Sequence, residues 1–505
     1  MNKIYHWLAM ALAVMTLVSC NDWLDVKPDT EEREKDMFTT YRGYKEALAG
    51  CYLSMASRST YGEKLTMSDV DCLANLWVAP TQSATPELYY MHRHEYDNDD
   101  CRSGIKAIYG GLYNTVVQAN MVINHAKDDA SVFPDDDSRN VIIGEALAIR
   151  AYCHFDALRL FGQMPNGAKK TVSLPYSESN DINTQPSYYG FSDFARKVLA
   201  DLDEAEQRLA KSDPILKYTF SQLSQEGNNT VTLDDDFMMY RRSRLNYWAV
   251  KALKARVYLY VGEQQKAYQT AKEVINAKLN GDPVVELSGD GDYSAGYYGL
   301  PHECLFALQN SKLSDYNVTL LGGTTSSNIN NQLHLTTNML NKQLYAGQNT
   351  TSNNRYLNMW ERESHTSTGN KYPTIRKYYW NTQTSHTLNV LRNCLQIMPM
   401  LRLSEMYLIA MEATTDLAEA NSLYKTYMAA RSVNVTDDMT SLDDVKQTVI
   451  AEYRREFYGE GQMFYVYKRL GTSELFFSYN EMSDDEYDLP LPESEFDPNL
   501  NADKQ

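Results

Sequence analysis

The sequence has 505 residues, enough for one large domain, or two to three ordinary ones, with a sizeable core. Its formal net charge is −18 at pH 7, which argues against a nucleic-acid partner and against electrostatic adhesion to anionic lipid. Tyrosine is abundant, with 38 residues against 14 Phe. The phenol ring offers an apolar face and a hydroxyl, which suits a partly hydrated surface such as a glycan-binding face. For any single Tyr, however, a position at the rim of a helix-packing core is the more common one.

The first residues are typical of a secretory signal. Lys3 gives a basic start, and residues 8–18 form an apolar run that is too short to span a bilayer. The run ends in Leu17-Val18-Ser19-Cys20, which resembles the lipobox of bacterial lipoproteins, where the signal is cut before an acylated cysteine. Acyl chains such as palmitate would hold the protein on a bilayer, since each buried methylene contributes about 0.8 kcal/mol. The alternative is an ordinary signal in which Cys20 is incidental.

An acidic, polar segment with Pro28 follows at residues 21–36 and is typical of a tether. We therefore predict a signal peptide over residues 1–19 and a lipidated N-terminus and tether over residues 20–40. The remainder, residues 41–505, is predicted to be a single domain.

Eight stretches carry apolar residues at three- and four-residue steps, the pattern of amphipathic helices. In pairs they predict four helical hairpins: 41–55 with 105–126, 141–161 with 191–209, 245–260 with 264–277, and 403–413 with 417–428. In the third pair, small alanines on both helices and Gly262 between them resemble a tetratricopeptide unit. The predicted fold class is therefore mainly α, a tetratricopeptide-like helical hairpin scaffold with loop-rich insertions that form the ligand face.

Two stretches interrupt the scaffold. Residues 67–101 are aromatic and loop-like, and residues 278–398 are rich in Gly, Asn, Ser, Thr and Tyr with a strand-like run at 304–308. An insertion on a repeat scaffold is a common place for a binding surface, so 278–398 is predicted to bind the ligand. The scaffold itself is assigned mainly to 41–277 and 399–470. A further helix is predicted over 442–458, and the proline-containing residues 471–505 are predicted to be an extended tail.

Five stretches in order along the chain carry a family resemblance. They are the lipobox followed by Trp23-Leu24-Asp25, Gly144–Tyr152 running on to Leu160–Pro165, Arg402–Leu408 with Glu412-Ala413, Arg454–Gln462 into Tyr467–Leu470, and Leu489–Pro492 to Leu500. Together they resemble the SusD/RagB-type nutrient-binding lipoproteins of Gram-negative outer membranes. The family often has Ala where Met411 stands, and Arg then Trp where Met463 and Phe464 stand, departures that affect packing.

The resemblance implies a single, mostly helical domain with tetratricopeptide-like hairpins under a loop-rich ligand face. It also implies a lipid-anchored, cell-surface position on the outer membrane and a partner, a SusC-like TonB-dependent transporter that receives captured glycan or peptide. The family is one of binding proteins rather than enzymes. The leading hypothesis is therefore oligosaccharide uptake, with a peptide ligand as the alternative.

The sequence gives little support to catalysis or to a cofactor. Carboxylates are abundant, but sequence spacing does not reveal the spatial pair that glycoside hydrolysis needs, so a helical glycoside hydrolase is the weaker alternative. His92-Arg93-His94-Glu95 lacks the zinc-protease order. Acidic clusters at 97–100, at 234–236 and around Gly291 could hold calcium but lack the twelve-residue loop pattern. No catalytic residue, metal site or cofactor is predicted.

Several charged and thiol side chains are predicted to be structural. Glu405 and Glu412 are expected to form helix salt links near Arg402, and Arg454, Arg455 and Glu456 are likewise assigned to the scaffold. Beyond Cys20 there are six scattered cysteines without a Cys-x-x-Cys motif, which supports neither zinc nor a thioredoxin-like site. Cys51 and Cys153 lie within helical patterns and are expected to be buried.

Ligand-binding residues are predicted from aromatic side chains in the non-helical stretches, where exposure is expected. The candidates are Trp77, Tyr293, Tyr297, Tyr298, Tyr316, Trp360, Tyr378 and Trp380. A ring stacked on a sugar face removes about 100 Å² of apolar surface from water, worth about 2.5 kcal/mol before costs. A millimolar complex needs about 4 kcal/mol, so several rings and added hydrogen bonds are required. The alternative for each ring is packing beneath its own loop.

Overall fold

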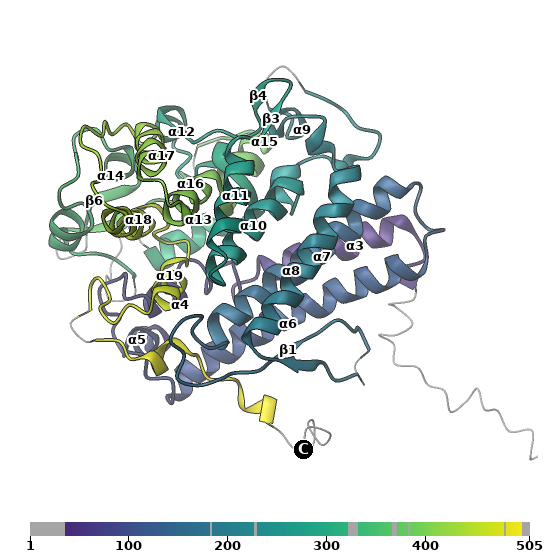
Figure 1. Ribbon diagram of the computed structural model, residues 1–505, viewed down its shortest axis with the longest axis horizontal. Helices are drawn as coiled ribbons and strands as arrows, with labels where there is room; N and C mark the ends of the chain where they lie inside the picture. The colour runs from purple at the N-terminus through teal and green to yellow at the C-terminus, as the bar shows by residue number, and fades with distance from the viewer. Residues whose placement is uncertain are drawn as a thin grey trace, which may run out of the picture.

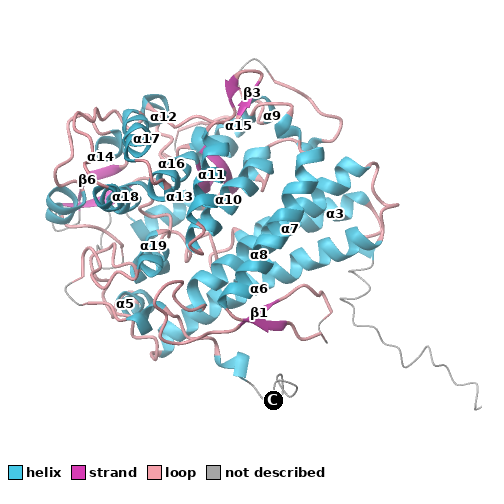
Figure 2. Ribbon diagram, in the orientation of Figure 1, coloured by secondary structure: helices cyan, strands magenta, loops and turns pink. Residues whose placement is uncertain are grey.

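The computed structural model describes residues 36–181, 184–226, 230–321, 332–365, 371–381, 384–478 and 481–496. The predicted signal, the lipobox with Cys20 and most of the tether fall outside these ranges. The described chain is mainly helical, as Figure 2 shows. None of its helices is long and apolar enough to cross a membrane.

Long helices from the N-terminal half form one layer of the molecule (Figure 1). They are α3 (Tyr41–Met55), α6 (Asp99–Asp128), α7 (Asp136–Phe161) and α8 (Phe191–Ser212). Helix α7 contacts α3, α6 and α8, so all of its residues from Val141 to Phe161 are buried, charged side chains such as Glu145 and Arg150 included. Its N-cap is Asp135, whose carboxylate accepts a hydrogen bond from the Ser138 backbone N–H at 2.6 Å, and its C-cap is Gly162.

The second group of helices lies against this layer. It comprises α10 (Tyr247–Tyr260), α11 (Gln264–Ile275), α16 (Leu403–Ala413), α17 (Leu417–Ala429), α18 (Leu442–Glu456) and α19 (Met463–Leu470). Helix α10 packs on α8 and α11 packs on α16, so the two groups share one hydrophobic core. The four predicted hairpins are confirmed: α3 contacts α6, α7 contacts α8, α10 contacts α11 and α16 contacts α17.

Short elements fill the remaining layer. The short α-helices are α4 (Asp69–Leu73), α5 (Pro86–His92), α9 (Phe220–Leu223), α12 (Asp290–Ala295), α13 (Leu313–Tyr316), α14 (Asn354–Asn358) and α15 (Leu388–Val390). The 3-10 turns are η2 (Pro214–Leu216), η3 (Asp236–Met238), η4 (Arg241–Ser243), η5 (Pro301–Glu303), η10 (Asp484–Tyr487) and η11 (Glu493–Phe496), and the π-helical turns are η6 (Asn317–Leu321), η8 (Met339–Leu344) and η9 (Leu391–Leu395).

The described strands form four two-stranded antiparallel sheets. The pairs are β1 (Leu174–Tyr176) with β2 (Ser187–Tyr189), β3 (Lys278–Leu279) with β4 (Asp282–Pro283), β5 (Cys304–Gln309) with β8 (Ile397–Arg402), and β6 (Trp360–His365) with β7 (Lys371–Ile375). The strand-like run at 304–308 is therefore confirmed. It pairs with β8, with Cys304 opposite Arg402, so the C-terminal end of the insertion lies beside a strand from its first third.

Three expectations about elements differ from the structure. Residues 67–101 are not purely loop, because they hold α4 and α5; Pro86 at the first position of α5 supplies a favourable helix start. Helix α19 was not predicted, since its eight residues are too few to show a clear period. The helix expected at 105–126 begins earlier, at Asp99, because the Asn98 side chain caps it by accepting a hydrogen bond from the Asp100 N–H at 2.9 Å.

A buried network of charged side chains joins the insertion to the scaffold. Its members, all at most 8% exposed, are Glu303, Arg355, Lys377, Arg402, Arg431, Glu452, Arg455, Glu456 and Glu460. Glu456 on α18 lies at the centre and accepts hydrogen bonds from Arg402 at 2.7 Å, Arg431 at 2.8 Å and Arg355 at 3.0 Å. Burial alone would raise the pKa of Glu456, but the guanidinium of Arg431, with those of Arg402 and Arg355, holds it well below its usual range.

The predicted salt-link partners of two glutamates were wrong. Glu405 pairs with Arg256 at 2.6 Å and Glu412 pairs with Arg469, while Arg402 belongs to the network around Glu456. The local helix rule failed because Glu405, which is buried, and Glu412, which is half-buried, find partners on other helices.

The six described cysteines are free and buried. The expected burial of Cys51 and Cys153 is confirmed. Burial raises the pKa of the Cys51 and Cys101 thiols to about 12, so both are protonated at neutral pH.

Candidate ligand-binding site

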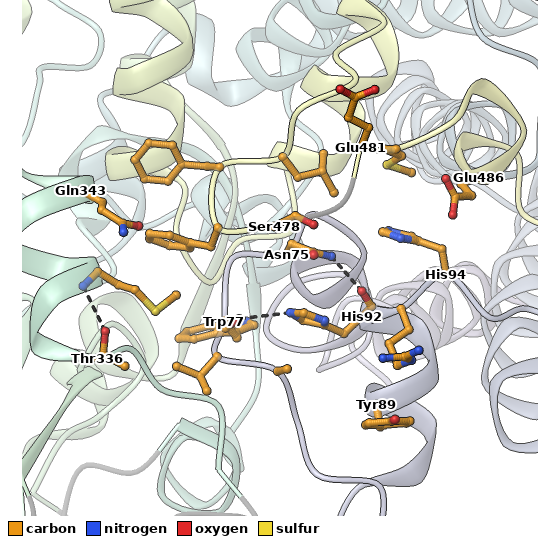
Figure 3. Close-up of a pocket in the computed structure, with 18 residues that line it drawn as sticks. Asn75, Trp77, Tyr89, His92, His94, Thr336, Gln343, Ser478, Glu481 and Glu486 are labelled. Atoms are coloured by element: carbon orange, nitrogen blue, oxygen red, sulfur yellow. Dashed lines mark hydrogen bonds between the residues drawn. The ribbon is translucent and has the colours of Figure 1, made fainter.

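A cavity of about 450 Å³ opens between three segments that are far apart in the sequence (Figure 3). One segment is α5 with the turn before it, the second is the π-helical turn η8, and the third is the tail, which contributes residues from 475–478 and from 481–486. Figure 3 draws its lining: Asn75, Trp77, Val78, Ala79, Tyr89, His92, Arg93, His94, Thr336, Met339, Gln343, Leu475, Phe476, Phe477, Ser478, Glu481, Met482 and Glu486. This size and this mixture of apolar and polar groups are typical of small-molecule sites.

Four aromatic rings contribute to the walls. Tyr89, Phe476 and Phe477 are half-buried, which leaves ring surface open to the cavity, whereas Trp77 is only 1% exposed. Phe476 and Phe477 lie with ring centroids 4.7 Å apart. The Arg454 guanidinium lies 4.3 Å from the Phe476 centroid, and Arg454 also donates a hydrogen bond to the Tyr467 hydroxyl at 2.8 Å. Arg454 therefore fixes Phe476 against α18 and α19.

Hydrogen bonds hold the turn before Trp77 against α5. Asn75 has φ of 52°, a left-handed conformation that Asn adopts more readily than most residues. Its amide donates to the Cys72 carbonyl at 3.2 Å and to the His92 carbonyl at 2.9 Å. The Val78 N–H donates to the His334 carbonyl at 3.0 Å. This last bond ties the same wall to the insertion.

Both histidines in the wall are neutral at pH 7. Burial lowers the pKa of His92 to about 4 and also lowers the pKa of His94. His92 Nε2 lies 3.3 Å from the Trp77 carbonyl, and His94 Nε2 lies 2.8 Å from the Leu73 carbonyl. Because a carbonyl only accepts, each Nε2 carries the proton, and both rings serve to position the backbone.

Trp77 stands at the end of a buried aromatic column. Its ring meets Tyr458 edge-on at a centroid distance of 4.9 Å, and Tyr458 meets Trp360 at 5.1 Å. Trp360 begins strand β6 of the insertion, so the column runs from the cavity wall through the end of α18 into the insertion. Edge-to-face contacts at these distances are favourable, and they fix the Trp77 ring.

The eight aromatic residues predicted from the sequence are not brought together. Of these, Trp77 is the one that lines the described cavity. The expected exposure was wrong for Trp77, Tyr293, Trp360, Tyr378 and Trp380, all of which are buried. Each of these is packed in the core; the Tyr378 hydroxyl, for instance, donates to the Gly459 carbonyl at 2.7 Å.

Tyr297, Tyr298 and Tyr316 are half-buried and lie outside this cavity. Arg376 lies 5.3 Å from the Tyr298 centroid, and Arg58 lies 5.1 Å from that of Tyr316. Their part in ligand binding stays a prediction.

Sequence reasoning missed the rings that are open to the cavity. Tyr89 stands in a stretch recognised as aromatic, but Phe476 and Phe477 stand in the tail, about which no ligand-binding expectation was formed. The available signal was an adjacent aromatic pair in a segment without helical period.

In the acidic cluster around Gly291, which was considered for calcium, both carboxylates are engaged in protein contacts. Asp290 accepts hydrogen bonds from Asn354 and Ser432, and Asp292 accepts from Ser288 and lies close to His302 Nδ1. Among the residues that the structure describes, no group of three or more His, Cys, Asp or Glu is placed to hold a metal ion.

The fold defines a class of protein, a tetratricopeptide-like helical scaffold whose irregular segments surround a concave aromatic site. Comparison with known proteins agrees with this class. A family profile described as "Starch-binding associating with outer membrane" matches residues 22–224. SusD-like protein P2 of Formosa agariphila is 21% identical over 98% of this chain and 97% of its own length.

Solved structures share the fold. A SusD superfamily protein of Bacteroides thetaiotaomicron superposes with a TM-score of 0.68 at 22% identity, covering 92% of this chain and 98% of the other. Surface glycan-binding protein A of Bacteroides uniformis superposes with a TM-score of 0.66 at 14% identity, covering 91% and 98%. The chain is therefore similar in sequence to SusD-like proteins and shares the fold of these solved structures.

Proposed function

We propose that this protein binds an oligosaccharide in the cavity beside Trp77 and delivers it to a SusC-like TonB-dependent transporter of the outer membrane. The observation that carries the proposal is the concave site of about 450 Å³ with three accessible aromatic rings beside amide and hydroxyl side chains. Sugars offer flat apolar faces to rings and hydroxyls to polar groups, so the two surfaces complement each other.

The energetics support useful but modest affinity. If Tyr89, Phe476 and Phe477 each cover about 100 Å² of sugar surface, the gross gain is about 7 kcal/mol. Association costs at least about 4 kcal/mol in lost translational and rotational freedom, so weak binding is expected from stacking alone. Hydrogen bonds and a linked transporter would strengthen it.

Calorimetry with separate glycan and peptide pools tests the ligand class. The proposal expects heat and saturation with a glycan pool, and loss of both in Phe476→Ala/Phe477→Ala. Tyr258→Ala is the matched control, because that ring is half-buried on α10 and lies outside the cavity. Saturable binding of peptides without any glycan binding would favour the peptide alternative instead.

The proposed membrane anchor is lipidated Cys20, exposed by removal of residues 1–19, and residues 20–40 are the proposed tether. The lipobox and the family's association with the outer membrane support it. Cys20→Ala should release the protein from the membrane, and the wild-type protein should co-purify with an outer-membrane barrel. Retention of Cys20→Ala on the membrane, with no barrel recovered, would refute anchoring and delivery.

A binding role without catalysis is part of the proposal. The family's glycan-binding character supports it. Chromatography of glycan pools after long incubation with concentrated protein should show unchanged chain lengths. Product formation that is lost on changing a single carboxylate would establish the hydrolase alternative.

A further inference from the structure

We infer that the cavity beside Trp77 takes an uncharged oligosaccharide and rejects sugars that carry carboxylate, sulfate or phosphate groups. The inference rests on the proposed glycan-binding function and concerns the chemical class of glycan. It follows from the charges around the cavity.

The cationic groups of the wall are few and already engaged. Arg93 is the one Lys or Arg among the described residues that line the cavity. Its Nε donates to Glu95 at 2.6 Å, and its guanidinium lies 5.4 Å from the Tyr89 centroid. His92 and His94 each direct a ring N–H at a backbone carbonyl and are neutral, so neither offers a positive charge to a ligand.

The cavity lining also contains two negatively charged side chains, Glu481 and Glu486. Figure 3 shows Glu481 and Glu486 on the same side of the cavity as His94, with Thr336 and Gln343 on the other side. Glu486 is held in place because its carboxylate accepts the Ser483 N–H at 2.6 Å as part of a capping box. The two carboxylates outnumber the one guanidinium, that of Arg93, so the formal net charge of the lining is negative.

The groove next to the cavity is also lined by acidic residues. A wider groove of about 1220 Å³ shares His94 and Glu486 with the cavity and continues along the tail. Its further acidic residues are Glu95, Asp97, Asp485 and Asp488. Its one lysine among the described lining residues, Lys170, lies 3.6 Å from Asp488 and 3.8 Å from Asp485. An oligosaccharide that extends from the cavity into this groove stays in a negative field.

These charges discriminate between classes of glycan. Proteins recognise carboxylate and sulfate groups through charge-assisted hydrogen bonds from Arg or Lys, most strongly when the guanidinium is available for a bidentate contact. Here an anionic sugar would instead meet like charges, the repulsive element by which a site rejects a wrong ligand. The amide of Gln343 and the hydroxyl of Thr336 suit neutral sugar hydroxyls.

The volume sets the length of ligand that fits. A hexose unit displaces roughly six water volumes of about 30 Å³ each. The cavity of about 450 Å³ therefore holds two to three units, and the wider groove takes any further units.

Calorimetry with matched pairs of ligands tests the inference. Neutral hexose tetrasaccharides of several linkages are compared with the same compounds after oxidation of the C6 hydroxyls to carboxylates. We expect the neutral form of the tightest ligand to bind at least tenfold more tightly at low salt. We expect the gap to narrow when salt is raised or in Glu481→Gln/Glu486→Gln, because both changes weaken the negative field.

The outcomes separate this inference from the proposed function. Tighter binding of the oxidised forms, weakened by salt, would overturn the inference and leave glycan binding standing. A gap that neither salt nor the double variant changes would also overturn it, since the preference would then come from the C6 hydroxyl itself. If no form binds, the proposed function fails and the inference fails with it.

Discussion

Replacing Glu456 by Gln should destabilise the protein by about 3–5 kcal/mol. The change keeps the size of the side chain but removes the charge that faces Arg355, Arg402 and Arg431, all of which are at most 1% exposed. Removing one partner from a buried ionic cluster typically costs this much, because the three arginines lose the negative charge that they share and keep only Glu303, Glu452 and Glu460 as counter-charges. The Tyr427 hydroxyl also loses the carboxylate to which it donates at 2.7 Å.

The assay is thermal unfolding by calorimetry or circular dichroism. At about 2.1 cal/mol/K per residue, the unfolding entropy of 505 residues is about 1 kcal/mol/K, so the loss corresponds to a fall in Tm of about 3–5 °C. Glu46→Gln is the matched control, because Glu46 pairs with Arg42 on the surface and should shift stability by less than about 0.5 kcal/mol. Hydrogen exchange should also show faster opening of residues 354–358, which carry Arg355. A Glu456→Gln protein with the Tm of the control would refute the reasoning.

Further predictions concern the cavity and the buried titratable groups. Arg454→Gln should weaken glycan binding a few-fold in calorimetry by freeing the Phe476 ring, whereas Arg454→Lys should restore part of the loss; equal affinities in all three proteins would contradict this positioning role. Between pH 6.5 and 4 the unfolded chain protonates His92 while the folded protein, with its pKa of about 4, does not, so the free energy of unfolding should fall by about 3 kcal/mol over this window. Denaturation measured at a series of pH values should show that His92→Gln lacks this fall in the free energy of unfolding. The same pH dependence in His92→Gln and in the wild-type protein would disprove the assignment. In Cys20→Ala protein, the six remaining thiols should resist a thiol reagent until denaturant is added, and rapid reaction of Cys394, whose pKa burial raises to about 12, would contradict the described packing.

The scaffold was predictable because its signals are local. The apolar steps of Tyr41–Met55 lie within one helix, and the predicted bounds agree with α3. The structural role of Glu456 was also predictable from its motif, but its partners were not. Arg431, Arg402 and Arg355 lie 25, 54 and 101 residues away along the chain, and each comes from a different element. Local charge patterns do not reach such distances.

The cavity was harder to predict for the same reason. Trp77 and Phe476 belong to segments that meet only in the folded protein, and composition alone does not tell an exposed ring from a buried one. Trp360 illustrates the difficulty: it occurs in a polar, non-helical stretch, yet it is buried against Tyr458. In the structure Trp360 supports the cavity wall through its contact with Tyr458, which packs on Trp77.

The position of Glu456 in the chain has a consequence for biosynthesis. Ribosomes make the chain from its N-terminus, so Arg355, Arg402 and Arg431 are all synthesised before the carboxylate that they share. A nascent chain that ends before α18 holds these arginines without Glu452, Glu456 or Glu460, so burying them then would leave Arg402 and Arg431 with Glu303 alone and Arg355 without either of its carboxylates. The insertion, α16 and α17 therefore reach full charge compensation around these arginines only once α18 is present.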